Sequence, residues 1–221
     1  MEAWRITWFT VATALVATAL MLPPGLALAW LLARGRFRGQ VLLDTIVSLP
    51  LVMPPVATGL VLLGLFAPFG PVGRVLSRMG VDVVFTWKAV VVAMVVMGLP
   101  LLVRTARSGI EQVDRRFEAA AATLGAGPVR VFFTITLPLA RPAVVAGAVL
   151  GFARALGEFG ATVMIAGSIP GSTRTLAVGI YSLAETGRDR EAFVLVGISA
   201  GIAFAALLGA NWLIRPSGER A

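Results

Sequence analysis

Two ionisable residues lie deep inside an apolar run of the sequence and are the first candidates for chemistry. Arg154 and Glu158 are four positions apart within residues 142–166. Residues four apart share one face of a helix, so the guanidinium and the carboxylate can neutralise each other. Charges inside a bilayer are costly and mark functional sites by default. Two interpretations stay open: a structural pair facing the interior of a bundle, or groups at a gate or along an anion route.

A second polar group follows this run. Ser168, Gly171, Ser172, Thr173 and Arg174 offer hydroxyls, backbone amides and one guanidinium. Such donors suit a dianion near a membrane face. An ordinary loop has a similar composition, so the local chemistry alone leaves both interpretations open. The candidate residues for a gate or translocation path are Arg154, Glu158, Ser172, Thr173 and Arg174.

The residue types that are missing exclude several classes of function. The chain has no His and no Cys, so it lacks thiolate and imidazole ligands and the usual acid–base catalyst. Its one lysine, Lys88, does not belong to a GxxxxGK[ST] phosphate loop. The net charge of +8 comes from arginines spread around apolar runs, which argues against nucleic acid. We predict no enzyme, no catalytic residue, no metal site and no cofactor in this chain.

Membrane-spanning helices must position the polar candidates. The sequence is 58% hydrophobic, and a helix needs about 20 apolar residues to cross a bilayer. Five runs are long enough: residues 9–33, 45–66, 83–103, 142–166 and 192–214. The amphipathic residues 175–185 form either a short external helix or a re-entrant element that raises the number of spans to six. We therefore predict an all-α integral membrane protein with one transmembrane domain over residues 1–221.

The arginines predict an orientation in the membrane. Loops on the cytoplasmic side carry an excess of Lys and Arg. The side that includes the loop after the first run holds most of the arginines, among them Arg34, Arg36, Arg38, Arg215 and Arg220. The N-terminus is then outside, the C-terminus is in the cytoplasm, and residues 107–138 form a cytoplasmic loop.

Prolines interrupt several of the predicted spans. They are Pro23, Pro24, Pro50, Pro54, Pro55 and Pro100. Each proline removes a backbone donor and can kink its helix. The kinks are either packing irregularities or bends in helices that line a path, because neighbours or a cavity must satisfy the freed carbonyls.

The cytoplasmic loop has the pattern of two helices separated by a turn. Its apolar residues recur at steps of three and four, which predicts one helix over residues 110–124. Gly125 suits a helix stop and Pro128 suits the first position of a second helix. Alanines at positions 119–122 make the first helix slim. A docking element for a partner and a simple connector both stay open on these grounds.

The same stretch resembles the EAA loop of ABC-importer permeases. That pattern is Glu-Ala-Ala, three residues, Gly, nine residues and Ile-x-Leu-Pro. This chain matches the glycine and the end of the pattern, but Ala119 stands at the usual Glu position and Glu118 lies one residue upstream. The residues that the resemblance assigns to coupling are Glu118, Ala119, Ala120, Ala121, Gly125, Ile135, Leu137 and Pro138.

The resemblance implies a set of partners. Residues 107–138 would be a coupling segment seated in a groove of an ATPase subunit, and ATP and Mg²⁺ would bind to two such subunits rather than to this chain. A second copy of the chain would complete the path in the lipid of the cell membrane, and an external binding protein would deliver the substrate.

Two further blocks indicate the substrate class. Residues 157–162 and 169–176 resemble the molybdate-type branch of the oxyanion permeases. The resemblance implies an importer of molybdate, with tungstate as a related substrate. The alternatives are a sulfate-type ABC permease and, from a different class, an ion-coupled secondary transporter or channel that uses Arg154 and Glu158.

Overall fold

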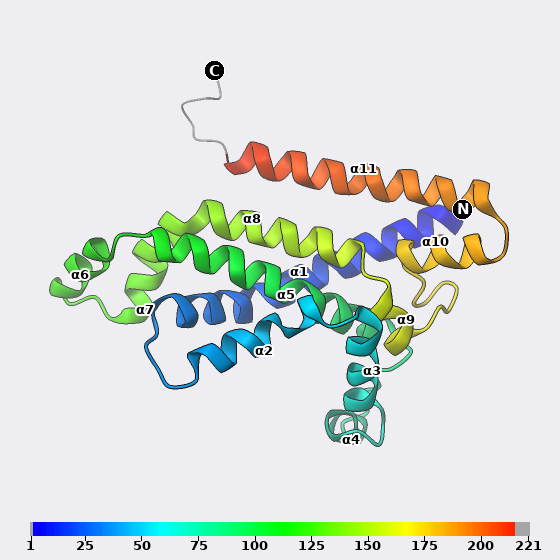
Figure 1. Cartoon of the computed structure of the whole chain (residues 1–221), viewed down its shortest axis with the longest axis horizontal. Helices are drawn as coiled ribbons and strands as arrows, with labels where there is room; N and C mark the ends of the chain where they lie inside the picture. Colours follow the sequence, from blue (N-terminus) through cyan, green and yellow to red (C-terminus); the bar gives the residue numbers. More distant parts are fainter. Residues whose placement is uncertain (1, 215–221) are drawn as a thin grey trace.

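The computed structural model describes residues 2–214, and every regular element in that range is a helix (Figure 1). This confirms the all-α fold class. In chain order the helices are α1 (Glu2–Arg34), α2 (Gln40–Val52), α3 (Pro55–Phe66), α4 (Pro71–Arg78), α5 (Trp87–Gln112), α6 (Arg115–Thr123), α7 (Pro128–Val131), the π-helical turn η1 (Phe132–Thr136), α8 (Leu137–Leu156), α9 (Gly160–Ala166), α10 (Leu176–Glu185) and α11 (Asp189–Ile214). Arg215 and Arg220, used above for orientation, lie outside the described residues.

Five segments of the described chain can cross a membrane by length and composition. Four are single helices or helical stretches: Glu2–Arg34, Trp87–Gln112, Pro128–Leu156 and Asp189–Gly209. The fifth is the pair α2 and α3, which is bent by 115°. Residues 175–185 form the short apolar helix α10, so five spans describe this part of the chain if the bent pair counts as one.

Two of the predicted spans are not continuous helices. The prolines indicated a bend near Pro54 and Pro55 in the first, whereas the break in the second was not predicted. Residues 45–66 break at Met53 and Pro54, because Pro54 and Pro55 lack the backbone donors that would continue the helix. Residues 142–166 break at positions 157–159, where α8 ends and the short helix α9 begins in a new direction. Apolar composition therefore predicted the apolar segments but not the break at positions 157–159 within one of them.

The third span lies further along the chain than predicted. It begins at Trp87, where the Thr86 hydroxyl accepts a hydrogen bond from the backbone N–H of Lys88 and caps the helix. It ends at Gln112 rather than at residue 103. Arg104, just beyond the predicted run, and Arg107, the first residue of the predicted loop, are consequently part of the helix.

Helix α5 is the centre of the bundle and packs closely against α1 and α8. Glycines permit the close approach: a Cβ on Gly151 would lie 2.7 Å from Met21 Cε of α1, and one on Gly147 would lie 3.1 Å from the Leu102 carbonyl of α5. Small residues at helix contacts are the usual way in which membrane helices approach, because lipid supplies no hydrophobic drive between them. Close van der Waals packing at these glycines therefore holds the core of the bundle together.

The two broken spans meet each other. A Cβ on Gly59 of α3 would lie 2.7 Å from Ala161 Cα of α9, and a Cβ on Gly160 would lie 2.7 Å from Pro55 Cβ. The two short helices therefore touch backbone to backbone. Figure 1 shows α9, α10 and the N-terminus at one end of the bundle and α6 and α7 at the opposite end.

Candidate coupling and translocation sites

The predicted single helix over residues 110–124 is two helices in the structure, so that prediction was wrong. Helix α5 ends at Gln112, Val113 is extended, and Asp114 caps α6 by accepting a hydrogen bond from Arg116 N–H at 2.9 Å. An aspartate that binds a backbone donor two residues later competes with a continuous helix. The break turns α6 away from the bundle at its end.

The turn after α6 lies where the sequence places it. Gly125 has a φ of 83°, in the left-handed region that favours glycine. A Cβ at this position would meet no atom within 4 Å, so the requirement for glycine is conformational rather than spatial. Pro128 then occupies the first turn of α7, where its missing N–H costs nothing.

A charged contact joins the first helix of this pair to the membrane spans. Glu118 Oε1 accepts hydrogen bonds from Arg34 Nε at 3.1 Å and from Thr136 Oγ1 at 2.7 Å. Arg34 Nη2 also donates to the Val113 carbonyl at 2.7 Å, at the break between α5 and α6. The side chains of Arg34 and Glu118 are only 13% and 18% exposed. We call Arg34, Glu118 and Thr136 the Glu118 brace.

The outer side of the helix pair is apolar and uncovered. No residue of α6 is buried. Ala119 and Ala120 are exposed and Ala121 is half-buried, as befits a slim helix. Large apolar side chains surround them, and we call this set the outer apolar surface: Phe117 (57% exposed), Leu124 (88%), Val129 (64%) and Phe133 (60%).

The second helix of the pair is continuous with the fourth span, which the sequence interpretation had separated at Pro138. Residues 128–156 form one helical stretch that passes through the π-helical turn η1. In that turn Leu137 N–H bonds to the Phe132 carbonyl, five residues back, next to Pro138, which has no N–H to donate. Ile135 and Leu137 are half-buried and Pro138 is exposed. Motion of this helix end would be transmitted directly into the span.

Arg154 and Glu158 are paired, but they do not lie on one continuous helix. Arg154 is in α8, and Glu158 lies just beyond its end, with 2.7 Å between Arg154 Nη1 and Glu158 Oε2. Glu158 Oε1 accepts a hydrogen bond from Ala161 N–H at 2.7 Å in the first turn of α9. The Glu158 side chain is 1% exposed. A carboxylate at a helix N-terminus is favourable, so the pair joins the two halves of a broken span.

The predicted anion-site residues of the loop between α9 and α10 fall into two groups. Ser172 and Arg174 line a cavity of 480 Å³ together with Glu2 and Arg5 of α1. Arg174 Nε donates to Ser168 Oγ at 3.2 Å, and its Nη1 is 3.8 Å from Glu2 Oε1. Thr173 is fully buried, and its hydroxyl accepts a hydrogen bond from Ile169 N–H within the turn. It is therefore not available to an anion in this cavity.

The candidate residues form separate sites. The Glu118 brace and the outer apolar surface lie at the α6 end of the bundle, whereas Glu158 and the cavity of Arg174 lie towards the α9 and α10 end (Figure 1). Sequence reasoning missed Arg34 and Arg5 as site residues. One sequence signal could have indicated Arg34. It is a cation in the last turn of a helix, where a positive charge interacts favourably with the free carbonyl groups.

A bundle of apolar spans with an exposed helix pair at one end is the architecture of a multi-pass membrane protein. The chain belongs to the family of binding-protein-dependent transport system inner membrane components, whose family model matches residues 25–212. It is therefore a multi-pass inner-membrane protein and a permease subunit of an ABC transporter.

Characterised relatives refine the family. The Molybdenum transport system permease protein ModB of Escherichia coli (strain K12) is 45% identical over 220 residues, covering 99% of this chain and 96% of that protein. ModB of Haemophilus influenzae is 43% identical over 194 residues, covering 87% and 85%. The Sulfate transport system permease protein CysT of Salmonella typhimurium is 40% identical over 157 residues, covering 71% and 57%. The chain belongs to the molybdate-type branch of the family.

Solved structures share the fold. The chain resembles one in the inward-facing MetNI methionine ABC transporter with a TM-score of 0.71, 18% identity, and coverage of 97% of this chain and 95% of that chain. It also resembles a chain of the bacterial alginate ABC transporter in complex with an alginate-bound periplasmic protein, with a TM-score of 0.75, 18% identity, and coverage of 97% and 79%. At these identities the likeness concerns the fold alone.

The Glu158 contacts predict how the broken span responds to loss of its charge. Glu158→Gln leaves one acceptor for Ala161 N–H but removes the charge that faces Arg154. A charged hydrogen bond of this kind contributes about 2 kcal/mol. We expect the thermal midpoint of the purified protein to fall by about 5 °C, given the usual scaling for chains of this size.

A double variant distinguishes a structural role of the Arg154–Glu158 pair from a role in transport. Arg154→Met with Glu158→Gln removes both charges, so we expect it to recover part of the lost stability and to transport substrate at permissive temperature. If Glu158→Gln melts like the wild type yet fails to transport, Glu158 is a pathway group and the structural interpretation is wrong.

Proposed function

We propose that two copies of this chain form a path that imports molybdate across the cytoplasmic membrane at the expense of ATP. The observation that carries the proposal is the 45% identity to the Escherichia coli molybdenum permease over 99% of the chain. Residues 157–162 and 169–176, which resemble molybdate-type permeases, lie at the α9 end of the path. Tungstate, an oxyanion of the same shape and charge, is a related substrate.

Two ATPase subunits supply the work in this proposal. The chain has no phosphate loop, so ATP and Mg²⁺ bind to those partners. Residues 107–138 act as the coupling segment of a single permease domain over residues 1–221. Its outer apolar surface provides the area that docks into an ATPase groove, because exposed apolar patches mark interaction sites. Glu118 faces inward to the brace, so shape and packing carry the docking.

An external binding protein delivers the oxyanion at the opposite end. The alginate transporter chain that shares this fold was solved with its periplasmic protein, which supports a partner of that type. The end that bears α6 and α7 is then cytoplasmic, and the N-terminus of α1 is outside, in agreement with the distribution of arginines. The cavity of Arg5 and Arg174 lies on the side where the anion arrives.

Transport follows from a movement of the coupling segments. Closure of the ATPase pair upon ATP binding draws the two coupling segments together, and each segment is continuous with α8 through η1. Movement of α8 reaches α9 through the Arg154–Glu158 pair and α1 through the Glu118 brace. The spans thereby alternate between inward-facing and outward-facing states, and hydrolysis resets them.

A sulfate permease is the second candidate, because the Salmonella typhimurium sulfate permease is 40% identical over 157 residues. Uptake of labelled molybdate and sulfate decides between them, in cells deleted for this chain and re-expressing it. We expect re-expression to restore molybdate uptake and leave sulfate uptake unchanged. Restored sulfate uptake alone would identify a sulfate permease, and uptake by the purified chain without any ATPase would identify a secondary transporter.

The coupling turn makes a prediction with a matched control. Gly125→Val places a β-branched residue at a φ of 83° and costs roughly 1–3 kcal/mol of backbone strain. Gly127 is two residues away with a φ of −69°, and a Cβ there also meets nothing within 4 Å. We expect Gly125→Val to lose copurification with the ATPase and Gly127→Val to retain it. Equal copurification of both variants would show that the turn does not govern docking.

A further inference from the structure

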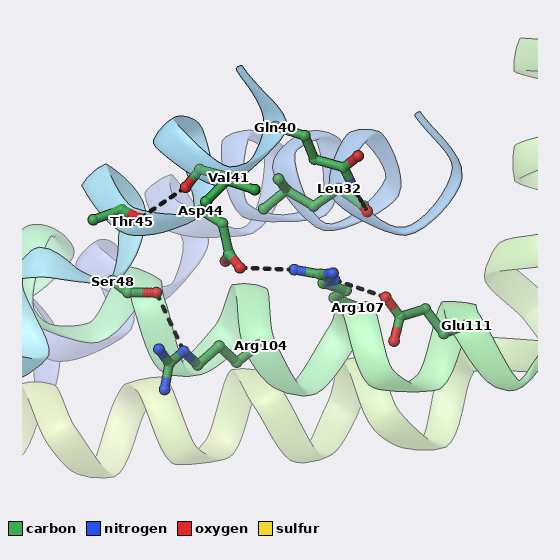
Figure 2. A network of polar contacts seen from close by, with 9 residues as sticks. All are labelled: Leu32, Gln40, Val41, Asp44, Thr45, Ser48, Arg104, Arg107 and Glu111. Atoms are coloured by element: carbon green, nitrogen blue, oxygen red, sulfur yellow. Dashed lines mark hydrogen bonds and ion pairs between the residues drawn. The ribbon is translucent and has the colours of Figure 1, made fainter. Parts of the chain in front are cut away.

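Helix α5 carries two arginines one turn apart, and they have different partners (Figure 2). Arg107 lies between two carboxylates: its Nη1 is 3.0 Å from Asp44 Oδ2 of α2, and its Nε is 2.7 Å from Glu111 Oε1. Its positive charge is therefore fully matched within the chain. Asp44 and Arg107 also fix α2 to α5.

Arg104 has no such match. Its Nε donates to Ser48 Oγ of α2 at 3.2 Å (Figure 2), and no carboxylate among residues 2–214 forms an ion pair with it. Its side chain is exposed on this chain. Ser48 is 8% exposed, and within residues 2–214 its hydroxyl accepts this bond without donating one. The pair thus presents free guanidinium N–H groups and a hydroxyl proton.

The position of Arg104 is inside the bundle rather than at its end. Leu102, two residues earlier, touches Gly25 of α1 and Gly147 of α8 so closely that neither position can hold a Cβ without a shift of its neighbours. Gly25 precedes the end of α1 at Arg34 by nine residues, or about 13 Å of helix. Arg104 therefore lies roughly 10 Å inside the level of Arg34. An unpaired guanidinium at such depth cannot face lipid without a large cost.

The break between α2 and α3 gives an independent reason for a cavity beside the face of α5 that carries Arg104. The chain between α2 and α3 breaks at Met53 and Pro54, and Pro54 and Pro55 are exposed on this chain. Irregular backbone at membrane depth is tolerated only where protein buries it or water reaches it. Ser48 lies on α2 little more than one turn before this break. The Arg104 side of α5 and the broken span therefore belong to a face that lipid does not cover.

We propose that Arg104 and Ser48 form a binding site for the transported oxyanion on the cytoplasmic side of the path. The inference rests on the function proposed above and adds to it the residues that hold the anion before release. Guanidinium and hydroxyl donors suit the oxygens of a tetrahedral dianion. Two copies of the chain supply two Arg104 guanidiniums, which match the two charges of molybdate. Arg107 does not compete, because Asp44 and Glu111 occupy it.

The natural absence of cysteine permits a direct test. Arg104→Cys in the assembled complex removes the charge and introduces a single reactive group in this chain. We expect molybdate uptake to fall about tenfold or more, the cost of one charged hydrogen-bonding contact. Treatment with the cationic reagent aminoethyl methanethiosulfonate should restore much of the uptake, and the neutral methyl reagent should not. A residue that only fills space beside α2 would respond equally to both reagents.

The neighbouring Val103 provides the control, because it is fully buried. Val103→Cys should react with neither reagent, and the wild-type complex treated in parallel reports reaction with partner subunits.

If Arg104→Cys assembles poorly, Arg104→Lys replaces it and should raise the KM for molybdate while ATP hydrolysis continues. Normal uptake by Arg104→Cys, or an equal response to both reagents, would overturn the inference. A wild-type complex that takes up no molybdate would instead refute the proposed function.

Discussion

The Glu118 brace is the contact on which the α6 end of the molecule depends. Helix α6 buries none of its residues, so apolar packing does not hold it to the membrane spans. It is held by a carboxylate that binds Arg34 at the end of α1 and Thr136 in the π-helical turn of the fourth span. Arg34 also binds the Val113 carbonyl, where α5 ends. Because these groups are largely shielded from water, their attraction is screened less than that of a surface pair. One ionic contact therefore connects three spans to the helix that lies outside them, and it leaves the opposite surface of that helix free for a partner.

The two broken spans give the rest of the bundle its polar sites. A break frees backbone groups, and each break here has nearby polar contacts. Glu158 binds the first turn of α9 and pairs with Arg154 of α8. Helix α2 is joined to α5 by the Asp44–Arg107 ion pair and by the half-buried Leu43 and Val47, which pack against the core that includes Val103 of α5. The glycine contacts between α3 and α9 join the two breaks backbone to backbone. Short rigid pieces with polar joints can change their relative angles with less disturbance of apolar packing than a straight helix, which is what alternating access requires.

The sequence predicted those features that depend on local chemistry. The turn at Gly125 and the helix start at Pro128 were predicted correctly, because a positive φ and a missing N–H are properties of single residues. Hydrophobic runs likewise predicted the five apolar segments that are long enough to span a membrane, if the bent pair of α2 and α3 counts as one. They did not predict the break at positions 157–159, since apolar residues suit a membrane span whichever way the helix points. Pro54 and Pro55 had indicated the bend at positions 53–54. The Glu118 brace was also missed. Arg34 and Glu118 are 84 positions apart, and nothing local indicates that a carboxylate next to an expected docking motif turns inward.

Coupling through the Glu118 brace is tested most directly by comparing ATP hydrolysis with transport in one preparation. The complex carrying Glu118→Gln, reconstituted in liposomes with its ATPase and binding protein, would be compared with Glu191→Gln, whose carboxylate is 56% exposed and pairs with the exposed Arg188. If the brace transmits the work, Glu118→Gln continues to hydrolyse ATP while molybdate uptake falls by about tenfold or more, the effect of one lost charged contact. Glu191→Gln keeps both activities close to those of the wild type, because an exposed ion pair contributes little. Unchanged uptake by Glu118→Gln, or a parallel fall of uptake and hydrolysis, would contradict a coupling role for the brace.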